Sequence, residues 1–508
     1  MLIPTLLFSG AAIMRRRDFC RSALAAGTLA TFPSAQALAA AANAMSVAGS
    51  VRAVTGAGAE VDIEAGAVRE LQDSLRGPLL MPGNAAYEDA RKVWNAMIDK
   101  HPALIVQCEG ASDVAQAVSF ARERNLLVAV RGGGHSISGK SVCEGGMMID
   151  MSQFNSVHVD PQAKTARVDG GCLEGHIDRE SAPFGLVTTA GVVSHTGAAG
   201  LTLGGGFGRV CRHFGMACDN IRHVDIVTAD GTLRRASANQ NPDLYWALKG
   251  GGGNFGVVVG FEFQLHEMDP TVIAGDIVWP GDQARQVLEF YGEHGNRMPD
   301  ELNLNIALVA TAEGEKRVSV EAVWCGDPAR ASEVLSPLRK VGQPIADTVA
   351  PVAYAKFQTR HDNANRHGIY SYMKSSFVNE LTPELIDEVV ALHRGDGVYW
   401  MYFMQAGGAV SRIGPQETAF PHRAAHSNMM VISETHEQKD RTADIAAVRS
   451  AWARLEPHTV GFYVNLMEAD DGRTRANYGA NYERLVKVKN RFDPGNLFRL
   501  NANIKPTA

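Results

Sequence analysis

Glycine is concentrated in one stretch of the chain. Residues 185–221 read GLVTTAGVVSHTGAAGLTLGGGFGRVCRHFGMACDNI. Six glycines of this stretch fall within 12 residues: Gly197, Gly200, Gly204, Gly205, Gly206 and Gly208. Consecutive backbone N–H groups in such a run can form a concavity that binds an anion. The stretch lacks the Gly-Lys-Ser/Thr of a P-loop, and it does not fit a GxGxxG fingerprint that opens a helix after the first strand. The stretch therefore predicts a loop whose backbone wraps around a ligand, but this loop is neither a P-loop nor a GxGxxG fingerprint.

A shorter glycine run stands upstream, where residues 130–142 read VRGGGHSISGKSV. Three consecutive glycines allow positive φ angles and a close approach of the backbone to a ligand. His135 follows them directly, so its side chain would point at whatever the loop holds. Two interpretations stay open from these residues alone. The loop holds a pyrophosphate from one side while the longer run holds it from the other, or it is a tight turn with an exposed histidine.

The overall composition is that of an ordinary globular protein. The chain has 508 residues, of which 45% are hydrophobic and 20% are charged, and its formal net charge is −6. This length suffices for two or more domains with sizeable cores. The mild acidity, without a basic cluster interleaved with aromatic residues, argues against a nucleic-acid partner. The seven cysteines show no CxxC pair and no zinc-like Cys/His spacing, so we expect no metal site and buried, apolar roles for most of them.

Residues 1–44 are predicted to be a signal peptide of the twin-arginine type. Consecutive arginines at positions 15–17 precede a modest apolar stretch that closes on small residues, which is typical of this export route. The apolar stretch is shorter than the roughly 20 residues that a membrane-spanning helix needs. We therefore expect a bacterial protein that is exported to the periplasm or secreted, without a membrane partner once the signal is removed. The start at Met1 or Met14 and cleavage after Ala39 or Ala44 stay open.

The chain up to Met268 alternates between helix-like and strand-like patterns. Apolar residues recur at helical spacing over residues 113–124, with Ser112 as the predicted N-cap. The other elements expected here are strands at 126–130, 147–151 and 256–268, hairpins at 156–171 and 224–237, and a short helix at 241–250.

The pattern changes near Pro270. The elements expected beyond it are a hairpin at 302–324, helices at 328–341, 383–394 and 442–455, and strands at 398–405 and 428–434. Strands joined by polar turns, with helices between them, favour an antiparallel sheet covered on one side. A final helix ends before Asp493-Pro494 and is expected to pack back on the first part. The predicted organisation is a signal at 1–44, a first domain at 45–268, a second at 269–456 and a C-terminal return at 457–508.

Five blocks of the sequence resemble one known family. They read YEDARKVWNAMIDKHPALIVQC (87–108), VRGGGHS (130–136), AGVVSHTGAAGLTLGGGFG (190–208), NPDLYWALKGGGGNFGVVVGFEF (241–263) and NYERLVKVKNRFDPGNLFRLNANI (481–504). In this order they resemble the berberine-bridge-enzyme-like FAD-linked oxidoreductases, which belong to the wider vanillyl-alcohol-oxidase (p-cresol methylhydroxylase) type of flavoprotein. The resemblance runs from about Tyr87 to Ile504. It implies an α+β fold in which a two-part FAD-binding domain accompanies a substrate domain, whose antiparallel sheet is covered by helices.

The resemblance implies that the protein binds FAD and that His135 is bonded to the 8α-methyl carbon of its isoalloxazine ring. The alternative, that His135 only hydrogen-bonds a phosphate, stays open. Some relatives add a second link through a Gly-Val-Cys motif, but this sequence reads Gly191-Val192-Val193, so we expect a single link. The other positions carried over to FAD are Arg131, Gly132, Gly133, Gly134, Ser136, Gly139, Gly191, Val193, Thr196, Gly197, Gly200, Leu203, Gly204, Gly205, Gly206, Asn220, Val258, Asn501 and Asn503.

Residues 462–467, FYVNLM, resemble the Tyr-x-Asn strand that lies beside the flavin ring in this family. The match carries over to Tyr463 and Asn465, with Tyr463 either as a base of lowered pKa or as a core aromatic residue. Some relatives have a catalytic glutamate just after a glycine pair, where this chain has Ser411-Arg412. That departure leaves Tyr463, Tyr402 and Gln405, together with Asn465, as the catalytic candidates.

The implied activity is oxidation of a small-molecule alcohol, sugar or amine-like substrate by hydride transfer to FAD, with O2 as the expected acceptor and H2O2 as its product. Two alternatives stay open: a reductase that uses NAD(P)H with noncovalent FAD, and a periplasmic flavoprotein that binds a ligand without turnover. The presence of His135, the glycine runs and Tyr463 favours an enzyme, because a binding protein needs neither a tether nor a base. The substrate and the oligomeric state stay open, since a fold does not determine a function.

Overall fold

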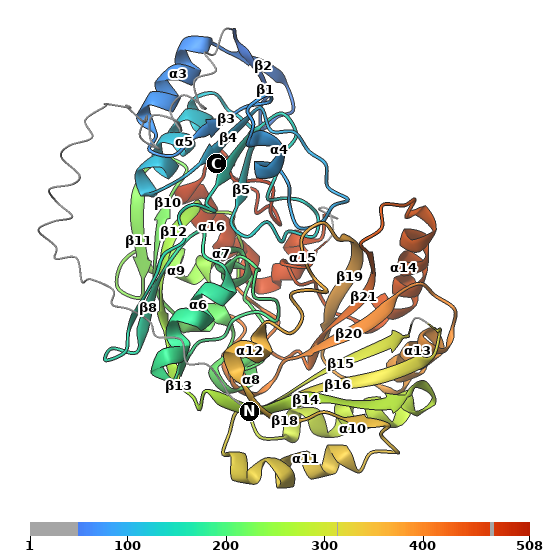
Figure 1. Ribbon diagram of the computed structural model, residues 1–508. Coiled ribbons are helices and arrows are strands. Elements are labelled where there is room, and N and C mark those ends of the chain that lie inside the picture. Colours follow the sequence, from blue (N-terminus) through green and yellow to red (C-terminus); the bar gives the residue numbers. More distant parts are fainter. Residues whose placement is uncertain (1–48, 312, 468–471, 508) are drawn as a thin grey trace, which may run out of the picture. The chain divides into compact units, whose positions relative to one another are not determined.

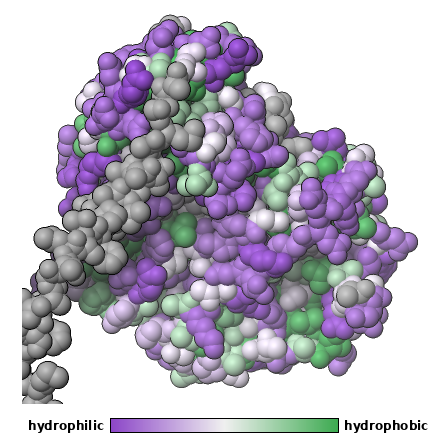
Figure 2. Space-filling model, turned by 45° about the horizontal axis from the view of Figure 1, so that its top comes forward, coloured by the Kyte–Doolittle hydropathy of each residue, from purple (hydrophilic) through white to green (hydrophobic). Residues whose placement is uncertain are grey.

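The computed structural model describes residues 49–311, 313–467 and 472–507 (Figure 1). The predicted signal peptide, with its alternative start and cleavage positions, lies outside the described residues. Among the residues that are described, no helix is long and apolar enough to cross a membrane. Figure 2 shows hydrophilic residues over most of one face, with hydrophobic residues in smaller groups between them.

The first sheet has four strands in the order β3-β4-β6-β5. Strands β4, β6 and β5 run parallel, and β3 pairs antiparallel with β4. Helix α5, Ala111–Glu123, follows β4 and buries Val114 and Val118 against this sheet. The helix begins at Ala111 after an extended Gly110, so the prediction of Ser112 as its N-cap is wrong. The strands are β3 Leu79–Leu80, β4 Leu104–Gln107, β5 Val128–Arg131 and β6 Met147–Asp150.

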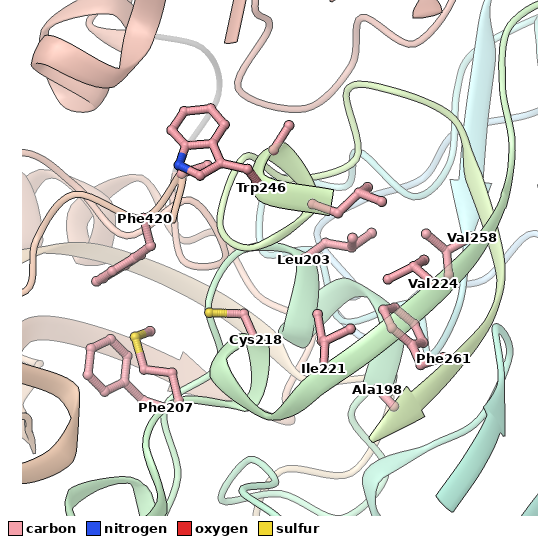
Figure 3. Close-up of a cluster of buried hydrophobic side chains, with 14 of the residues drawn as sticks. Ala198, Leu203, Phe207, Cys218, Ile221, Val224, Trp246, Val258, Phe261 and Phe420 are labelled. Carbon is pink, nitrogen blue, oxygen red and sulfur yellow. The ribbon is translucent and has the colours of Figure 1, made fainter. Parts of the chain in front are cut away.

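The second sheet has five antiparallel strands in the order β11-β10-β12-β8-β7. Both predicted hairpins are confirmed in it, because β7 pairs with β8 and β10 pairs with β11. Leu203, Val258 and Phe261 lie in one buried cluster with Trp246 and Phe420 (Figure 3). The strands are β7 Val157–Asp160, β8 Thr165–Asp169, β10 Ile221–Val227, β11 Leu233–Ser237, β12 Val257–Gln264 and, after a break, β13 His266–Glu267, which pairs with β9 Leu186–Val187.

The third sheet has eight antiparallel strands in the order β17-β14-β16-β15-β20-β21-β19, with β18 beside β14. Helices α10, α13 and α14 cover one face (Figure 1). The one-sided cover agrees with the prediction, although α10 is not among the predicted helices. Phe403 and Met429 of the sheet share a core with Val287 and Trp452 of these helices. The elements are β14 Thr271–Pro280, β15 Leu302–Ala310, β16 Lys316–Trp324, β17 Ala346–Asp347, β18 Ala350–Ala353, β19 Tyr370–Val378, β20 Trp400–Gln405, β21 Ser427–Thr435, α10 Ala284–His294, α13 Pro383–Arg394 and α14 Thr442–Leu455.

The C-terminal helix α16, Tyr482–Phe492, packs on α9, Pro242–Leu248, so that the red end of the chain lies among green elements of the first part (Figure 1). Lys489 Nζ lies 2.6 Å from Asp493 Oδ2, and both side chains are fully buried. The same ammonium group donates to the backbone carbonyl of Asn254 at 2.7 Å, which ties the helix to the first part. The boundaries of the predicted domains, at 268/269 and 456/457, stay predictions.

Five of the six described cysteines are buried and none of the six forms a disulfide, in agreement with the interpretation of most cysteines as small core residues. The remaining helices and strands are β1 Val51–Val54, β2 Glu60–Ile63, α3 Ala65–Ser74, α4 Tyr87–Ala90, α6 Glu174–Ser181, α7 Ala198–Leu203, α8 Cys211–Phe214, α11 Ala331–Arg339, α12 Tyr354–Gln358 and α15 Thr474–Tyr478.

Candidate active site

A cavity of about 450 Å³ lies between the glycine-rich loops and the face of the eight-stranded sheet opposite its helices. Residues 132–138 line it from the first glycine run, and part of residues 191–203 lines it from the second. Alternate residues of β20 and β21 form a further wall, and Tyr463 and Asn465 line the cavity from the C-terminal part. Four segments that are far apart in the sequence therefore meet at this cavity.

The loop after β5 places a row of backbone N–H groups along the cavity. Within the part of the chain that the structure describes, no N–H from Gly132 to Ser138 donates a hydrogen bond to another protein group. Gly134 has a φ of +71°, which glycine adopts more readily than other residues. Such a row of N–H groups suits oxygen atoms that carry negative charge. The loop therefore fits FAD, which has phosphate oxygens and ring carbonyls.

The two glycine runs touch each other at Gly133 and Gly197. A Cβ on Gly133 would lie 2.3 Å from the Gly197 nitrogen, and a Cβ on Gly197 would lie 2.3 Å from the Gly133 nitrogen. A methyl group does not fit at these distances, so both positions need glycine. The two runs, predicted to hold one ligand from two sides, thus meet at the wall of one cavity.

The longer glycine run reaches the cavity mainly through its first half, at Gly191, Val193, Thr196, Gly197, Gly200 and Leu203, and again at Phe207. Gly204, Gly205 and Gly206 are absent from the lining. A Cβ on Gly204 would lie 2.0 Å from Asn465 Oδ1, so this glycine makes room for a neighbouring side chain. Gly205 and Gly206 have φ angles of +123° and +87° in the turn after helix α7. These three residues serve packing and the geometry of the turn, and their contact with the cofactor stays a prediction.

Four further positions carried over to FAD also lie outside the cavity lining: Arg131, Gly139, Asn220 and Asn503. Arg131 lies 3.7 Å from the buried carboxylate of Asp150. Gly139 provides a turn with a φ of +67°. Asn220 donates to two backbone carbonyls at 2.9 and 3.0 Å. The contacts of Arg131, Gly139 and Asn220 position the surrounding loops, whereas the buried side-chain oxygen of Asn503 has no hydrogen-bond partner among the described residues. Direct contact of these four residues with the cofactor stays a prediction. Two other predicted positions do line the cavity, Val258 and Asn501.

His135 ends the glycine row and is surrounded by other rings. Its Nε2 lies 2.7 Å from Nδ1 of His195, and its ring stacks on Trp94 with centroids 5.3 Å apart. Nitrogens of His135, His195 and His367 all lie within 4.8 Å of one another, a spacing that would also suit a metal ion. Sequence reasoning missed His195 and His367. The available signal was the place of His195, two residues before Gly197 in the densest motif.

Burial of the imidazole, together with His195 and His367, lowers the pKa of His135 well below its ordinary value of 6.5. The ring is therefore neutral at neutral pH, and a neutral imidazole has a free lone pair for attack on carbon. This charge state is the one that the expected bond to FAD requires.

Tyr463 and Asn465 line the cavity beside the longer glycine run. The Tyr463 hydroxyl accepts hydrogen bonds from the Gly206 N–H at 3.0 Å and from Asn465 Nδ2 at 2.9 Å. Burial raises the pKa of Tyr463 to about 12, although these donors lower it. The expected lowering of this pKa is therefore wrong, because removal from water disfavours the phenolate more than the hydrogen bonds stabilise it.

Tyr402 lines the cavity, whereas Gln405 does not. Both lie on β20, where side chains alternate between the two faces of the sheet, and Gln405 falls on the side of Phe403 in the helix-covered core. Its amide accepts from the Leu304 N–H at 2.6 Å and donates to the Gly295 carbonyl at 2.9 Å. The prediction of a catalytic Gln405 is corrected, since both ends of its amide hold backbone. Burial raises the pKa of Tyr402 as well.

The strand that begins at Trp400 was expected to face the flavin, but the sequence did not single out the other sheet residues that line the cavity: Met373, Trp400, Met404, Met430, Ile432 and Glu434. Glu434 is the one carboxylate among the described lining residues. Burial raises its pKa from 4.5 to about 7, against Trp400 and Arg441, which lower it. The available signal was strand alternation, because Met430, Ile432 and Glu434 share one face of the strand predicted at 428–434.

Known proteins resemble this chain over nearly its whole described length. The model of the FAD binding domain family matches residues 102–237, and the model described as berberine and berberine like matches residues 462–505. An FAD-linked oxidoreductase of Dictyostelium discoideum is 30% identical over 86% of this chain and 97% of its own. The chitooligosaccharide oxidase of Gibberella zeae is 26% identical over 87% of this chain and 95% of its own.

A solved structure agrees with the fold. The crystal structure of 6-hydroxy-D-nicotine oxidase from Arthrobacter nicotinovorans matches with a TM-score of 0.77 and 26% identity, over 85% of this chain and 98% of that one. The expected α+β fold, with an FAD-binding domain and a sheet-rich substrate domain, is thereby confirmed. FAD is the cofactor, and the protein is an FAD-dependent enzyme. The chain belongs to the berberine-bridge-enzyme-like family of FAD-linked oxidoreductases.

Proposed function

We propose that this protein is an oxidase that removes a hydride from a small-molecule alcohol, sugar or amine, and that its FAD is bonded to His135. One observation carries the proposal: a neutral histidine ends a row of free N–H groups at the same cavity as an apolar sheet wall. Two relatives bear the name of oxidases, for 6-hydroxy-D-nicotine and for chitooligosaccharide. This supports O2 as the acceptor and H2O2 as its product.

The residues of the cavity have separable tasks in this proposal. FAD supplies the acceptor for the hydride. The N–H groups of residues 132–138 bind its oxygen atoms, and Gly197 and Gly200 keep the second wall free of side chains. Asn465 is held by its own bonds to the Leu201 carbonyl at 2.8 Å and to Tyr463, so its amide has a fixed direction at the cavity edge.

The sheet wall and the tyrosines act on the substrate. Met404, Met430 and Ile432 exclude water from the place where the substrate C–H must lie, which protects a hydride transfer. Tyr463, with a pKa of about 12, is protonated at neutral pH and orients the substrate by hydrogen bonding rather than by accepting its proton.

We also propose that the protein is exported. The arginines at positions 15–17 and the small residues that follow the apolar stretch support this. A covalent tether suits that location, because FAD lost outside the cytoplasm is not easily replaced. Cell fractionation of an Arg15/Arg16→Lys variant tests the proposal, which predicts that the variant stays in the cytoplasm.

Acid precipitation of the purified holoprotein tests the covalent bond. We expect a fluorescent pellet and an intact mass raised by one FAD, both of which His135→Ala removes. A yellow supernatant over colourless protein would contradict the covalent bond. Anaerobic bleaching by an oxidisable substrate, followed by H2O2 release in air, is expected of an oxidase. Bleaching by reduced nicotinamide alone would identify the reductase, and a substrate that binds without bleaching would identify a binding protein.

A further inference from the structure

The sheet wall of the cavity carries a single carboxylate in an otherwise apolar and aromatic surface. Its residues are Ala307, Met373, Trp400, Tyr402, Met404, Met430, Ile432 and Glu434. Glu434 lies two residues beyond Ile432 on the same face of β21, so strand geometry directs it to the cavity side. The following inference about this carboxylate rests on the proposed oxidase function.

No cation of the described residues pairs with Glu434. Within the described residues it forms no ion pair, although Arg441 lies close enough to lower its pKa. Arg441 already has partners, because its Nε lies 2.7 Å from Asp444 and its Nη2 donates to Ser433 Oγ at 2.6 Å. Ser433 belongs to the opposite face of the strand, so the arginine serves that side of the sheet. The half-buried carboxylate of Glu434 accepts a hydrogen bond from the neutral Trp400 side chain. A carboxylate that is largely removed from water and has no cation beside it is costly, and a ligand that brings a positive charge would remove this cost.

The neighbours of Glu434 favour a cationic, apolar ligand. The Trp400 side chain lies beside it. The Tyr402 ring follows on the same face of β20, with its centroid 5.7 Å from that of Trp400, and aromatic faces attract organic cations. The methionines adapt their shape to an apolar body. A sugar would leave several hydroxyls without partners on this wall, since an unpaired buried hydroxyl is unfavourable.

We propose that Glu434 binds the protonated nitrogen of the substrate, which is therefore an amine joined to an apolar or aromatic body. One ammonium proton passes to a carboxylate oxygen of Glu434, and the nitrogen lone pair becomes available. A C=N bond then forms as the neighbouring C–H leaves as a hydride. The substrate loses one proton and one hydride in total: Glu434 holds the proton, FAD takes the hydride, and the proposed acceptor O2 leaves as H2O2.

A matched pair of probes separates amine recognition from turnover. In 2-phenylpropan-2-amine and 2-phenylpropan-2-ol the carbon that bears nitrogen or oxygen has no hydrogen, so the oxidase cannot oxidise either compound. Calorimetric titration of the FAD-loaded enzyme is expected to give about tenfold or more tighter binding of the amine than of the alcohol. Glu434→Gln should abolish this preference by weakening the amine alone. Glu437→Gln, three residues on and exposed, is the control and should leave both affinities unchanged.

Equal binding of the two probes to the wild-type enzyme would overturn the inference, even if Glu434→Gln did not fold. A preference that survives in a folded Glu434→Gln variant, with normal flavin content, would also overturn it. Glu434→Asp keeps the charge and should retain part of the preference. With 1-phenylethylamine as an oxidisable substrate, we expect Glu434→Gln to raise KM as well as to lower kcat, whereas a purely structural role would change flavin content or melting.

The outcomes also separate this inference from the proposed function. Peroxide release with an alcohol or a sugar, without a preference for the amine probe, would leave the oxidase standing and reject the role of Glu434. An amine preference that depends on Glu434, in a protein that releases no peroxide with any amine, would support the binding site and reject the oxidase.

Discussion

His135 and His195 face each other across 2.7 Å, measured from Nε2 of the first ring to Nδ1 of the second. The other nitrogen of His195 lies 3.4 Å from the backbone carbonyl of Asp362, and Trp94 stacks on His135. The imidazole predicted to bond FAD is thus held in a defined orientation, with a proton acceptor beside it.

His195→Ala is expected to slow the attachment of FAD by about tenfold or more without preventing it, since one general base typically accelerates a reaction by 10²-fold or more. Attachment replaces the N–H bond of His135 and one C–H bond of the 8α-methyl group by an N–C bond, and the two hydrogens leave on O2 as H2O2. Mixing apoprotein with FAD and following in-gel flavin fluorescence over time measures the rate. His135→Ala should show no attachment at all. A wild-type rate in His195→Ala would show that His195 does not assist.

Gly133→Ala is expected to prevent FAD loading, because its new methyl group would collide with the Gly197 nitrogen at 2.3 Å. Flavin absorbance per protein measures the loading, and circular dichroism checks that the fold persists. Gly66→Ala is the matched control: Gly66 lies in α3 with no atom within 4 Å of an added Cβ, so alanine should stabilise the protein slightly, by about 0.5–1 kcal/mol. Normal FAD loading of Gly133→Ala would mean that the two glycine runs can move apart without loss of FAD binding.

Glu321→Ala is expected to destabilise the protein by about 3–5 kcal/mol, because it leaves a buried arginine without its partner. Arg209 follows the longer glycine run and bonds Glu321 of β16 twice, at 3.0 and 3.2 Å, with both side chains buried. Denaturant unfolding measures the change. Glu315→Ala on the same hairpin removes an exposed pair with Arg317 and should cost less than about 1 kcal/mol. If Glu321→Ala and Glu315→Ala lowered the free energy of unfolding equally, burial of the Arg209–Glu321 pair would make no difference to its contribution to stability.

The contribution of Glu321 should also depend on pH. Burial raises the pKa of this carboxyl, but Arg209 and His361 outweigh burial and hold it well below 4.5. A lowered pKa in the folded state stabilises the protein fully above the ordinary pKa and progressively less as pH falls toward the folded one. The difference in unfolding free energy between wild type and Glu321→Ala should therefore shrink below about pH 4.5. A difference that is constant down to pH 3 would contradict the charge-based explanation.

Glu434 should show the opposite pH dependence of stability. Its pKa is raised from 4.5 to about 7, chiefly by burial, so its contribution is fully present below pH 4.5 and is lost as pH rises through 7. Thermal melts of wild type and Glu434→Gln without substrate, from pH 4.5 to 8.5, are expected to show wild type losing stability relative to the variant. Parallel melting curves over this range would indicate a carboxylate that is already neutralised.

Tyr463→Phe is expected to cost about 1–3 kcal/mol of stability, because the buried Gly206 N–H loses its acceptor. Since the pKa of Tyr463 is about 12, the pH profile of kcat/KM between pH 6 and 9 should keep its shape in the variant. The disappearance of a titration in that range would instead identify Tyr463 as the base.

The sequence sufficed for most of the strands and for the position of the cofactor loop. Period-two patterns around polar turns such as Asp230-Gly231 specify hairpins locally, and three glycines before His135 need no tertiary information to be noticed. Local patterns could not predict which glycines of the longer run line the cavity and which serve packing. Gly204 is a glycine because Asn465 packs on it, and that contact joins residues 261 positions apart.

Other misses have different causes. Tyr402 and Gln405 differ in which face of β20 they occupy, and alternation would have separated them once the helix-covered face was known. Glu434 could be recognised as a site residue only once the sheet face opposite the helices was known to line a cavity. A lone carboxylate near the end of a strand is more often a solvated residue. The pKa of Tyr463 depends on its degree of burial, which no local pattern gives.

The alternation of β20 and β21 has a practical consequence for directed evolution. Positions 400, 402 and 404 and positions 430, 432 and 434 face the cavity, while Met401, Phe403, Met429 and Val431 between them belong to the helix-covered core. A combinatorial library confined to the six facing positions would diversify what the enzyme accepts and leave the glycine loops and the helix-covered core unchanged. Substrate selectivity can therefore be changed at these six positions without altering the glycine loops that are proposed to bind FAD.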